Sequence, residues 1–479
     1  MLFNSFPYIF CFLPLVVVLT SLVRKIAGLK AGPRAAQAIV LLASLFFYTW
    51  WKPIHLPYLL GSILVNWFIA RCIDASTGRR RKRLLQLGLV LNIGFLCVFK
   101  YVNFFLGSFP HLIPPRFLLP DFEFPLGISF FTITQIMYLV DCYESLLPAS
   151  TLFDHATFVS FFPYVISGPI ARAKRILHQT GDFGGKDGQR SEFLARGVYL
   201  FSIGLFKKVV IADAFAQVAA YGLNSAVDLS TVEAWVFSIA YTLQIYFDFS
   251  GYTDLAIASA LMLGIEIPRN FDAPYRSKSI IEFWQRWHIS LTNFITTYLY
   301  TPILRMFPRA TLTAASIATI LAMTVAGLWH GPSWTFVCYG LMHGIGLAFN
   351  QVWKKKKIWK LPAALSWFVT FSFVNIAFII FHSRTLADAA SRIGRLFPLH
   401  NIFGIANLTA MSERGIIFHF VALPLLIGVV VAFLGKSSEE LSREFKPTLA
   451  NSAAVVALTL IAWIFMNSTM GTPFVYFAF

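Results

Sequence analysis

Residues 324–350 read TVAGLWHGPSWTFVCYGLMHGIGLAFN, and they place a histidine, His330, between two long apolar segments. Gly331-Pro332 follows directly, and a proline at this point ends the preceding helix because it cannot donate a backbone hydrogen bond. A full charge at membrane depth costs about 2.5 kcal/mol or more, so an ionisable side chain in such sequence indicates a functional site. A second histidine, His288, lies upstream in the run Arg286-Trp287-His288-Ile289-Ser290.

The composition of the chain indicates an integral membrane protein. Of its 479 residues, 57% are hydrophobic and 13% are charged, and the mean hydropathy is +0.68. Soluble domains carry about 25% charged residues, so this chain has too few polar side chains to cover a water-soluble fold. The net charge of +17 lies in short basic loops, which favours topology signals and contact with anionic membrane lipids over nucleic acid as a partner.

The cysteines give no sign of a metal site or of a disulfide framework. All five lie within or beside apolar runs, and none has a CxxC or CxxH spacing. We interpret them as small buried hydrophobic residues and expect no bound metal.

Long apolar runs predict the membrane-crossing helices, each of which needs about 20 residues. The best candidates are Phe6–Val23, Leu56–Ile73, Leu84–Leu106, Val232–Phe249, Leu312–Leu328, Trp334–Val352, Leu361–Phe381, Ile416–Leu434 and Leu449–Met466. Shorter or interrupted runs must be covered by protein or must line a cavity, and together they bring the expected total to about eleven to fifteen segments. We therefore expect a single all-α polytopic membrane domain over residues 1–479. N-terminal helices would occupy residues 1–106, a catalytic core about 120–352, and C-terminal helices 361–479.

Lysine and arginine residues in short loops predict the orientation of the chain. The basic groups are Arg24, Lys25, Lys30 and Arg34, then Arg79-Arg80-Arg81-Lys82-Arg83, then Lys354 to Lys357 with Lys360. The loop Gly107–Glu123 is instead Pro-rich, with few basic residues. We expect the basic loops in the cytoplasm and the N-terminus outside. The first apolar run has no basic segment before it and is expected to be retained as a spanning helix.

Two carboxylates, Asp248 and Asp254, flank the run Ser250-Gly251-Tyr252-Thr253 within apolar sequence. Gly251 can break a helix there and expose backbone polar groups to a cavity. One interpretation is a polar lining for a substrate channel, and the other is a buried brace formed with Arg269, Arg276 or Arg286. In both, the carboxylates face the inside of the protein.

The segment 270–302 carries His288 among tryptophans, arginines and apolar residues. Ser279 is a predicted helix cap, with Glu282 three residues further on. If the segment is one helix, Trp284, His288 and Leu291 share a face. A single histidine on an aromatic face is more often a packed core residue than a catalyst, and His343 is interpreted in the same way.

Neutral imidazole, with a pKa of about 6.5, can act as a general base at physiological pH. Acyl transfer from a thioester to a hydroxyl needs such a base and no metal. The chain has no HExxH metal motif, no Gly-rich phosphate loop and no GxSxG nucleophile motif. Base-catalysed acyl transfer remains one open interpretation, and a transporter or flippase for a polar solute is another. Transporters often contain internal repeats, and no repeat is evident here.

Four runs in this order resemble the membrane-bound O-acyltransferase superfamily. They are DFSGYTDLAI (248–257), RNFDAPYRSKSIIEFWQRWHISL (269–291), GLWHGPSWTF (327–336) and PFVYFAF (473–479). The bacterial branch typified by alginate O-acetyltransferase is the most similar. That branch usually has a Gly-Gly-Asn-Arg-type turn after its Leu-Tyr-x-Pro segment. Here Ile303-Leu304-Arg305-Met306 stands instead, so the resemblance does not identify the acceptor.

The resemblance implies a fold, a site and a reaction. The fold is a bundle of tilted, spanning and re-entrant helices around a central funnel. His330 is implied to be the catalytic histidine and His288 a second histidine of the tunnel. Trp287, Asn293 and Trp329 would shape the tunnel together with Tyr252, and Asp248 and Asp254 would hold its polar wall.

The implied reaction is O-acyl transfer, by branch O-acetyl transfer, in the bacterial inner membrane. The donor would be cytoplasmic acetyl-CoA or another acyl thioester, with no permanently bound cofactor. The acceptor would be a hydroxyl of an exported polysaccharide or of an SGNH-type relay protein. The sequence does not name the polymer, the acyl chain, the relay partner or the oligomeric state.

Overall fold

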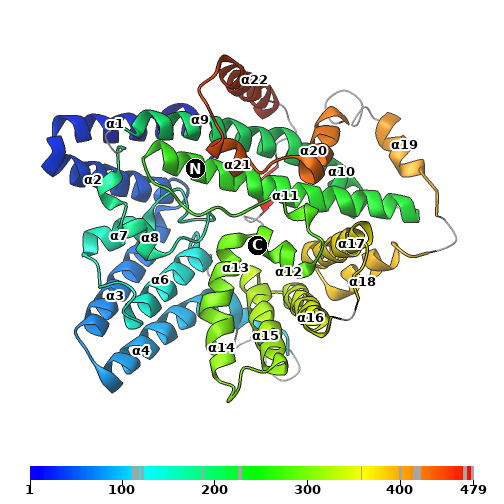
Figure 1. Ribbon diagram of the computed structural model, residues 1–479, viewed down its shortest axis with the longest axis horizontal. Coiled ribbons are helices and arrows are strands. Elements are labelled where there is room, and N and C mark those ends of the chain that lie inside the picture. The colour runs from blue at the N-terminus through cyan, green and yellow to red at the C-terminus, as the bar shows by residue number, and fades with distance from the viewer. Residues whose placement is uncertain are drawn as a thin grey trace. The chain divides into compact units, whose positions relative to one another are not determined.

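The computed structural model describes residues 1–109, 118–119, 123–185, 188–224, 229–357, 359–398, 402–413, 422–467 and 472–475. These residues form helices joined by loops and contain no strand (Figure 1). Seven of the helices are long and apolar enough to cross a membrane. The predicted all-α polytopic membrane fold is therefore confirmed.

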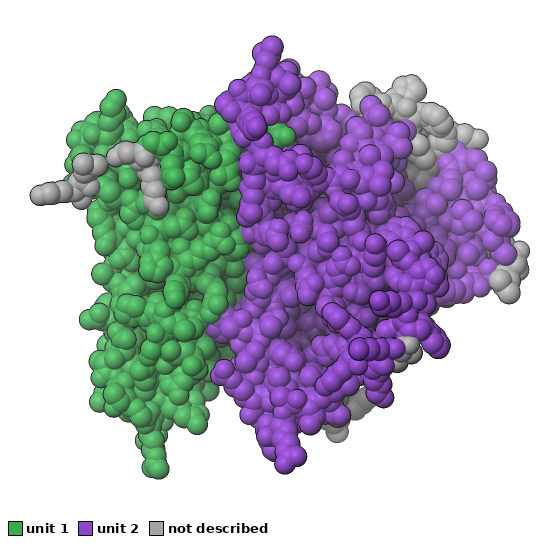
Figure 2. All heavy atoms as spheres, in the orientation of Figure 1, with its two compact units in different colours: residues 1–201, 255–268 green, residues 202–254, 269–479 purple. Residues whose placement is uncertain are grey.

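Some of the sequence predictions fall on residues outside this description. Most of the loop Gly107–Glu123, the core boundary near residue 120, the first six residues of the run Ile416–Leu434 and the last four residues of the run 473–479 lie outside the described residues. The predicted division into N-terminal helices, core and C-terminal helices stays a prediction. The chain itself forms two compact units, shown in green and purple in Figure 2.

Unit 1 comprises residues 1–201 and 255–268. Its helices include α1 (Leu13–Ile26), α2 (Gly28–Thr49), α3 (Leu56–Asp74), α4 (Gly78–Leu96), α5 (Val102–Gly107), α6 (Ile128–Tyr143), α7 (Leu152–Ser160), α8 (Ala173–Leu177) and most of α9 (Arg190–Phe206). Helix α1 packs along α2, and α6 packs against both α3 and α4. An aromatic cluster forms much of the core, with ring contacts among Phe3, Tyr8, Phe12, Phe47 and Phe162.

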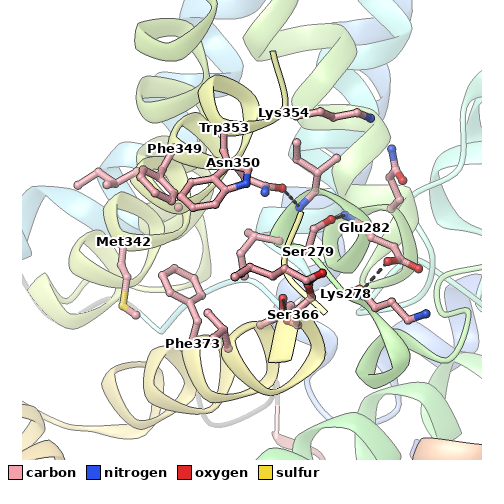
Figure 3. Close-up of a pocket in the computed structure, with 18 of the residues that line it drawn as sticks. Lys278, Ser279, Glu282, Met342, Phe349, Asn350, Trp353, Lys354, Ser366 and Phe373 are labelled. Carbon is pink, nitrogen blue, oxygen red and sulfur yellow. Dashed lines mark hydrogen bonds between the residues drawn. The ribbon is translucent and has the colours of Figure 1, made fainter. Parts of the chain in front are cut away.

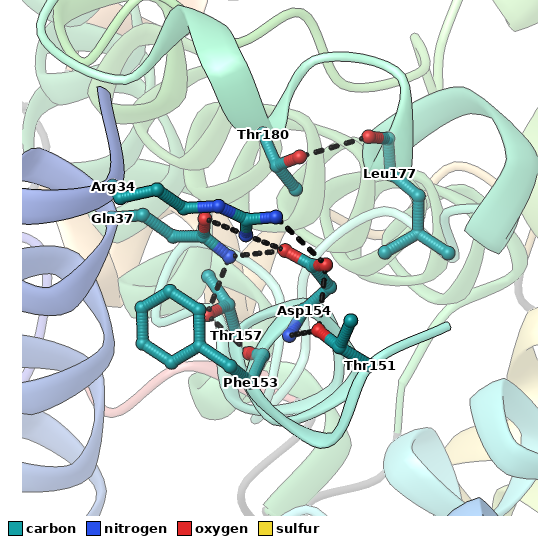
Figure 4. Close-up of polar contacts among 8 residues, drawn as sticks. All are labelled: Arg34, Gln37, Thr151, Phe153, Asp154, Thr157, Leu177 and Thr180. Carbon is teal, nitrogen blue, oxygen red and sulfur yellow. Dashed lines mark hydrogen bonds and ion pairs between the residues drawn. The ribbon is translucent and has the colours of Figure 1, made fainter. Parts of the chain in front are cut away.

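A polar junction fixes α7 to α2 (Figure 4). Arg34 forms an ion pair with Asp154, and the Gln37 amide donates to the same carboxylate at 2.9 Å. Thr151 caps α7 and also donates to Asp154 at 2.7 Å. Burial alone would raise the pKa of the Asp154 carboxyl, but hydrogen bonds from Arg34, Gln37 and Thr151 outweigh it, and the pKa is lowered. Arg34, predicted only as a topology signal, therefore also binds two helices together.

Unit 2 comprises residues 202–254 and 269–479 and contains both sequence-predicted histidines. Its helices are the π-helix η6 (Lys207–Ala212), α10 (Asp213–Asn224), α11 (Thr231–Met262, up to residue 254), η7 (Pro274–Arg276), α12 (Ile280–Arg286), α13 (Ile289–Phe294), η8 (Ile295–Tyr300), α14 (Thr301–Arg305), α15 (Leu312–His330), α16 (Trp334–Lys356), α17 (Ala363–His382), α18 (Leu386–Gly394), α19 (Ala406–Glu413), α20 (Ala422–Leu434), α21 (Ser438–Arg443) and α22 (Leu449–Met466).

Helices α15 and α16 form a closely packed hairpin whose turn carries His330. Helix α15 ends at His330, and Ser333 caps the start of α16, so the predicted helix break at Gly331-Pro332 is confirmed. Two glycines allow the helices to approach. A Cβ on Gly327 would lie 2.3 Å from the Phe336 carbonyl oxygen, and one on Gly340 would lie 2.3 Å from the Met323 carbonyl oxygen. Real Cβ atoms do not approach backbone so closely, so the hairpin requires glycine at both positions.

Replacing one of these glycines with a larger residue should push the two helices of the hairpin apart. We expect Gly340→Leu to destabilise the protein by about 3 kcal/mol, because the added side chain collides with the backbone of α15. Thermal unfolding of the purified full-length chain in detergent measures this. Gly94→Leu in α4 is the matched control, since a Cβ there meets nothing within 4 Å. Equal unfolding temperatures for the two variants would contradict the packing argument.

Candidate active site

His288 lies at a sharp break between α12 and α13. Its backbone is left-handed, with φ 42° and ψ 52°, which non-glycine residues rarely adopt. The conditional expectation that Trp284, His288 and Leu291 share one helical face is therefore wrong. The predicted cap is confirmed, because the Ser279 hydroxyl accepts from the Glu282 backbone N–H at 3.1 Å.

One side chain, Asn270, holds this break in place. Its Oδ1 accepts from the Ser290 backbone N–H at 3.2 Å and from the Ser290 hydroxyl at 2.8 Å, and it lies 3.0 Å from His288 Nδ1. The Asn270 carbonyl also accepts from the Ile289 N–H at 2.9 Å. These contacts reach across 18 to 20 residues of sequence, so no local pattern in the segment 280–294 encodes the break.

The Asn270 contacts also determine the tautomer of His288. A backbone N–H can only donate, so the Asn270 atom that faces Ser290 N must be the carbonyl oxygen. His288 Nδ1 lies against the same oxygen and must therefore carry the proton. Nε2 is then the acceptor nitrogen of the neutral ring. Burial lowers the pKa of His288 well below its usual value near 6.5, and the neighbouring His330 adds to this shift.

His330 lies at the C-terminal end of α15 within an aromatic enclosure. The ring centroids of Trp329, Phe381, Tyr339 and Phe336 lie 5.1, 5.3, 6.1 and 6.4 Å from that of His330. His330 retains 7% of its surface, whereas His288 retains none. Of the two histidines, His330 is therefore the slightly more exposed one.

Trp329 lies next to both imidazoles. Its ring centroid is 5.1 Å from His330 and 6.5 Å from His288. His288 also contacts Phe249, with ring centroids 4.8 Å apart and ring planes at 88°. The structure thus brings together three of the sequence-predicted site residues, His288, Trp329 and His330, from two separate segments of chain.

Two other residues that were predicted to shape the tunnel, one tryptophan and one asparagine, have different surroundings. Trp287 is buried among Phe271, Phe283 and Phe378, with ring centroids 5.0 to 5.6 Å apart. Asn293 is exposed on α13, and no described contact joins it to either histidine. His343 packs as expected for a core histidine: it is fully buried, and its Nδ1 accepts from Trp284 Nε1 at 3.1 Å.

Asp248 and Asp254 form buried ion pairs with two lysines of η6. Lys208 Nζ lies 2.7 Å from Asp248 and 3.0 Å from Asp213, and Lys207 Nζ lies 2.8 Å from Asp254. The expected arginine partners are wrong. Arg269 pairs with Asp272 and Glu439, Arg286 pairs with Glu282, and Arg276 donates to the Gly435 carbonyl. Our sequence reading missed the lysines, although Lys207-Lys208 interrupts the apolar run 198–212 and could have indicated them.

Gly251 explains why the lysines, and not the arginines, meet these carboxylates. Helix α11 continues through Gly251, so the possible break there is wrong. A Cβ on Gly251 would lie 2.9 Å from the Gly204 carbonyl oxygen and from the Lys208 backbone nitrogen. The glycine therefore lets α11 press against the chain around η6, which carries both lysines.

Residues 472–475 also contact these ion pairs. Val475 N–H donates to Asp248 at 2.7 Å, and Lys208 donates to the Thr472 carbonyl at 2.9 Å. Phe474 stacks on Tyr252 with ring centroids 4.1 Å apart and an angle of 11°. Tyr252, predicted to line the tunnel, is thus covered by this segment. Among the residues that the structure describes, no group of three His, Cys, Asp or Glu side chains could hold a metal ion.

Comparisons with known proteins agree with the fold. The sequence model of MBOAT, the membrane-bound O-acyltransferase family, matches residues 80–384, which include both histidines. The chain is 34% identical to the peptidoglycan O-acetyltransferase of Helicobacter pylori over 100% of this chain and 98% of that protein. It is 34% identical to the probable alginate O-acetylase AlgI of Pseudomonas aeruginosa, over 95% and 86% of the two chains.

A more distant relative is the teichoic acid D-alanyltransferase of Streptococcus thermophilus, 31% identical over 53% of this chain and 68% of that protein. The chain belongs to the membrane-bound O-acyltransferase family. It is a multi-pass membrane O-acyltransferase, and the match to this family favours the enzyme over the transporter alternative.

The buried lysine should be essential for stability. Lys208→Met leaves Asp213 and Asp248 without their shared cation, so we expect a loss of about 3 kcal/mol or more, measured by thermal unfolding in detergent. The double variant Lys208→Met/Asp248→Asn should recover part of this loss, because it also removes one uncompensated charge. Lys82→Met on the exposed start of α4 is the control. A double variant less stable than Lys208→Met would contradict the ion pair.

Proposed function

We propose that the chain is an O-acetyltransferase of the bacterial inner membrane that takes its acetyl group from cytoplasmic acetyl-CoA. The N-terminus and the acceptor would lie outside. The acceptor would be a hydroxyl of an exported polysaccharide or of an SGNH-type relay protein. Two relatives that match nearly the full chain, one named for peptidoglycan and one for alginate, support acetyl as the group and a glycan as the final acceptor.

The observation that carries this proposal is that two buried histidines, each at a helix break, both contact Trp329. The break at His330 ends α15 at an apolar hairpin, and the break at His288 is held by Asn270. Such breaks are tolerated at membrane depth where protein or a cavity covers them. A neutral imidazole can act as a general base near neutral pH.

In the proposed reaction His330 removes the proton from the acceptor hydroxyl. The resulting oxygen nucleophile attacks the thioester carbonyl carbon and forms a tetrahedral intermediate. Its collapse breaks the carbon–sulfur bond, forms the new oxygen ester and releases CoA thiolate, which takes the proton back from His330. No metal and no redox step is required, and all atoms of the two substrates appear in the ester and the thiol.

His288 would position the acceptor. Because its Nδ1 proton is directed at Asn270, Nε2 can accept a hydrogen bond from a hydroxyl but cannot donate one to a thioester carbonyl. Of the two roles open to His288, positioning and polarising a reactant, the tautomer supports positioning the hydroxyl. Trp329 would hold both imidazoles in place through its ring contacts. Asp248 and Asp254 would contribute indirectly, because their ion pairs with the lysines of η6 hold α11 in place.

Removal of the His330 imidazole tests the proposal directly. We expect His330→Ala to lower acetyl transfer by about 100-fold or more, the usual contribution of a general base, while the protein still accumulates in the membrane. The measurements are thiol release from acetyl-CoA by purified protein with its acceptor, and the ester content of the cell-surface glycan. His178→Ala, at an exposed position, is the matched control. Full activity of His330→Ala would refute the assignment.

Asn270 is predicted to be a positioning residue. Asn270→Ala should lower kcat by about 10-fold or more with little change in KM for acetyl-CoA, because His288 loses its fixed tautomer and orientation. Asn270→Asp retains the acceptor oxygens and should recover activity at alkaline pH, with the acid limb of the pH profile moved upward because a carboxylate favours imidazolium.

A merely structural role for Asn270 would give a different result. Asn375 is also buried and hydrogen-bonded, to Thr242 and Ser238 of α11, and provides the control. If Asn270→Ala and Asn375→Ala lose activity only in proportion to folded protein, and the pH profile of Asn270→Asp is unchanged, the positioning role is excluded.

A further inference from the structure

An elongated cavity of about 1490 Å³ lies in unit 2 between α12, α16 and α17 (Figure 3). One face of α16 forms its main wall, through Leu341, Met342, Ile345 and Phe349, and Phe373 of α17 stands opposite. Neither His288 nor His330 lines this cavity. It is therefore a feature that the acyl-transfer site does not explain.

The wall of the cavity is open and apolar. Ile345 and Phe349 on α16 are 52% and 62% exposed, and Val369 on α17 is 51% exposed. Helix α17 is one of the seven helices that are long and apolar enough to span a membrane. Side chains exposed beside such a helix face lipid hydrocarbon, so the cavity opens towards acyl chains and not only towards water.

The cavity is basic at the C-terminal end of α16. Lys354, Lys357 and Lys360 line it in or just after the last turn of that helix, and Lys278 lines it separately, from the segment before α12. The single acid among the lining residues, Glu282, is already paired with Arg286 at 3.1 Å and accepts from the Lys278 backbone N–H at 2.9 Å. The lysines thus form a site of net positive charge that this carboxylate does not neutralise.

Two tryptophans at this end of the cavity indicate that it lies at the level of the membrane–water interface. Trp353 donates from Nε1 to the Trp359 carbonyl at 3.0 Å, and their rings meet edge to face at 5.5 Å. Tryptophan concentrates at the level of lipid head groups, because its ring is apolar and its N–H is polar. Lysines beside such residues lie where phosphate groups of the bilayer lie.

The length of the cavity also suits a lipid. Its residues on α16 run from Cys338 to Lys354, which at about 1.5 Å per residue corresponds to about 24 Å. One leaflet contributes about 15 Å of hydrocarbon, and a head group lies beyond it. Two of the polar side chains inside already have backbone partners: Asn350 accepts from the Ile281 N–H, and Thr370 donates to the Ser366 carbonyl.

We propose that this cavity binds one anionic phospholipid, with its phosphate at Lys354, Lys357 and Lys360 and its acyl chains along α16 and α17. The charge of the basic end and the apolar open wall together require a ligand that is anionic at one end and hydrocarbon at the other. This inference concerns binding alone and is independent of the proposed acyl transfer.

The test uses the purified full-length chain and native mass spectrometry. Phosphatidylglycerol and phosphatidylcholine with identical acyl chains are offered in equal amounts in mixed micelles. A basic residue near an anionic lipid contributes about a fivefold preference, so we expect at least about tenfold more retained phosphatidylglycerol. The triple variant Lys354→Gln/Lys357→Gln/Lys360→Gln should bring the ratio below about twofold.

The matched control, Arg79→Gln/Arg80→Gln/Lys82→Gln, removes three exposed basic residues at the start of α4, outside the cavity, and should lower the ratio far less than the cavity variant does. Ile345→Trp fills the open wall and should reduce retention of both lipids. Retention that is equal for the two lipids, or that survives the triple variant, overturns the proposal. Displacement of phosphatidylglycerol by free CoA in the unmodified chain overturns it as well, because the cavity is then a nucleotide site.

Discussion

The pairing of buried lysines with buried aspartates inside an apolar helical bundle is the constraint on which this structure depends. Lys208 meets Asp248 and Asp213, and Lys207 meets Asp254, with the carboxylates and ammonium groups almost completely buried. An unpaired charge in such surroundings costs several kcal/mol, so these contacts hold α11 against η6. Phe249, the residue after Asp248 on α11, contacts His288. The charge network and the candidate active site therefore share one helix.

The two histidines are held in different ways. His330 is positioned by local sequence, since Gly331-Pro332 ends α15 and two glycines set the spacing of the hairpin. His288 is positioned by Asn270, whose single oxygen meets the imidazole, a backbone N–H and a hydroxyl. The first arrangement fixes where a ring lies, and the second also fixes which of its nitrogens carries the proton.

This difference explains what could be predicted from the sequence. The membrane class, the all-α fold and the break at His330 follow from composition, apolar run length and a Gly-Pro pair, all of which are local. The break at His288 was not predictable from periodicity, because the contact that stabilises it comes from 18 residues upstream. The partners of Asp248 and Asp254 were misassigned to arginines because the close approach at Gly251 depends on tertiary packing. Asn293, placed near the tunnel by resemblance, is exposed.

Helix α11 has a consequence for how the chain enters the bilayer during synthesis. It carries Glu233, Asp248 and Asp254, and an acidic residue at the centre of a helix opposes insertion by about 2.5 to 3.5 kcal/mol. Lys207 and Lys208 precede α11 in the chain and leave the ribosome before it does. The counter-charges for Asp248 and Asp254 are thus already present when α11 reaches the translocon, and the two segments can be inserted as a neutralised pair.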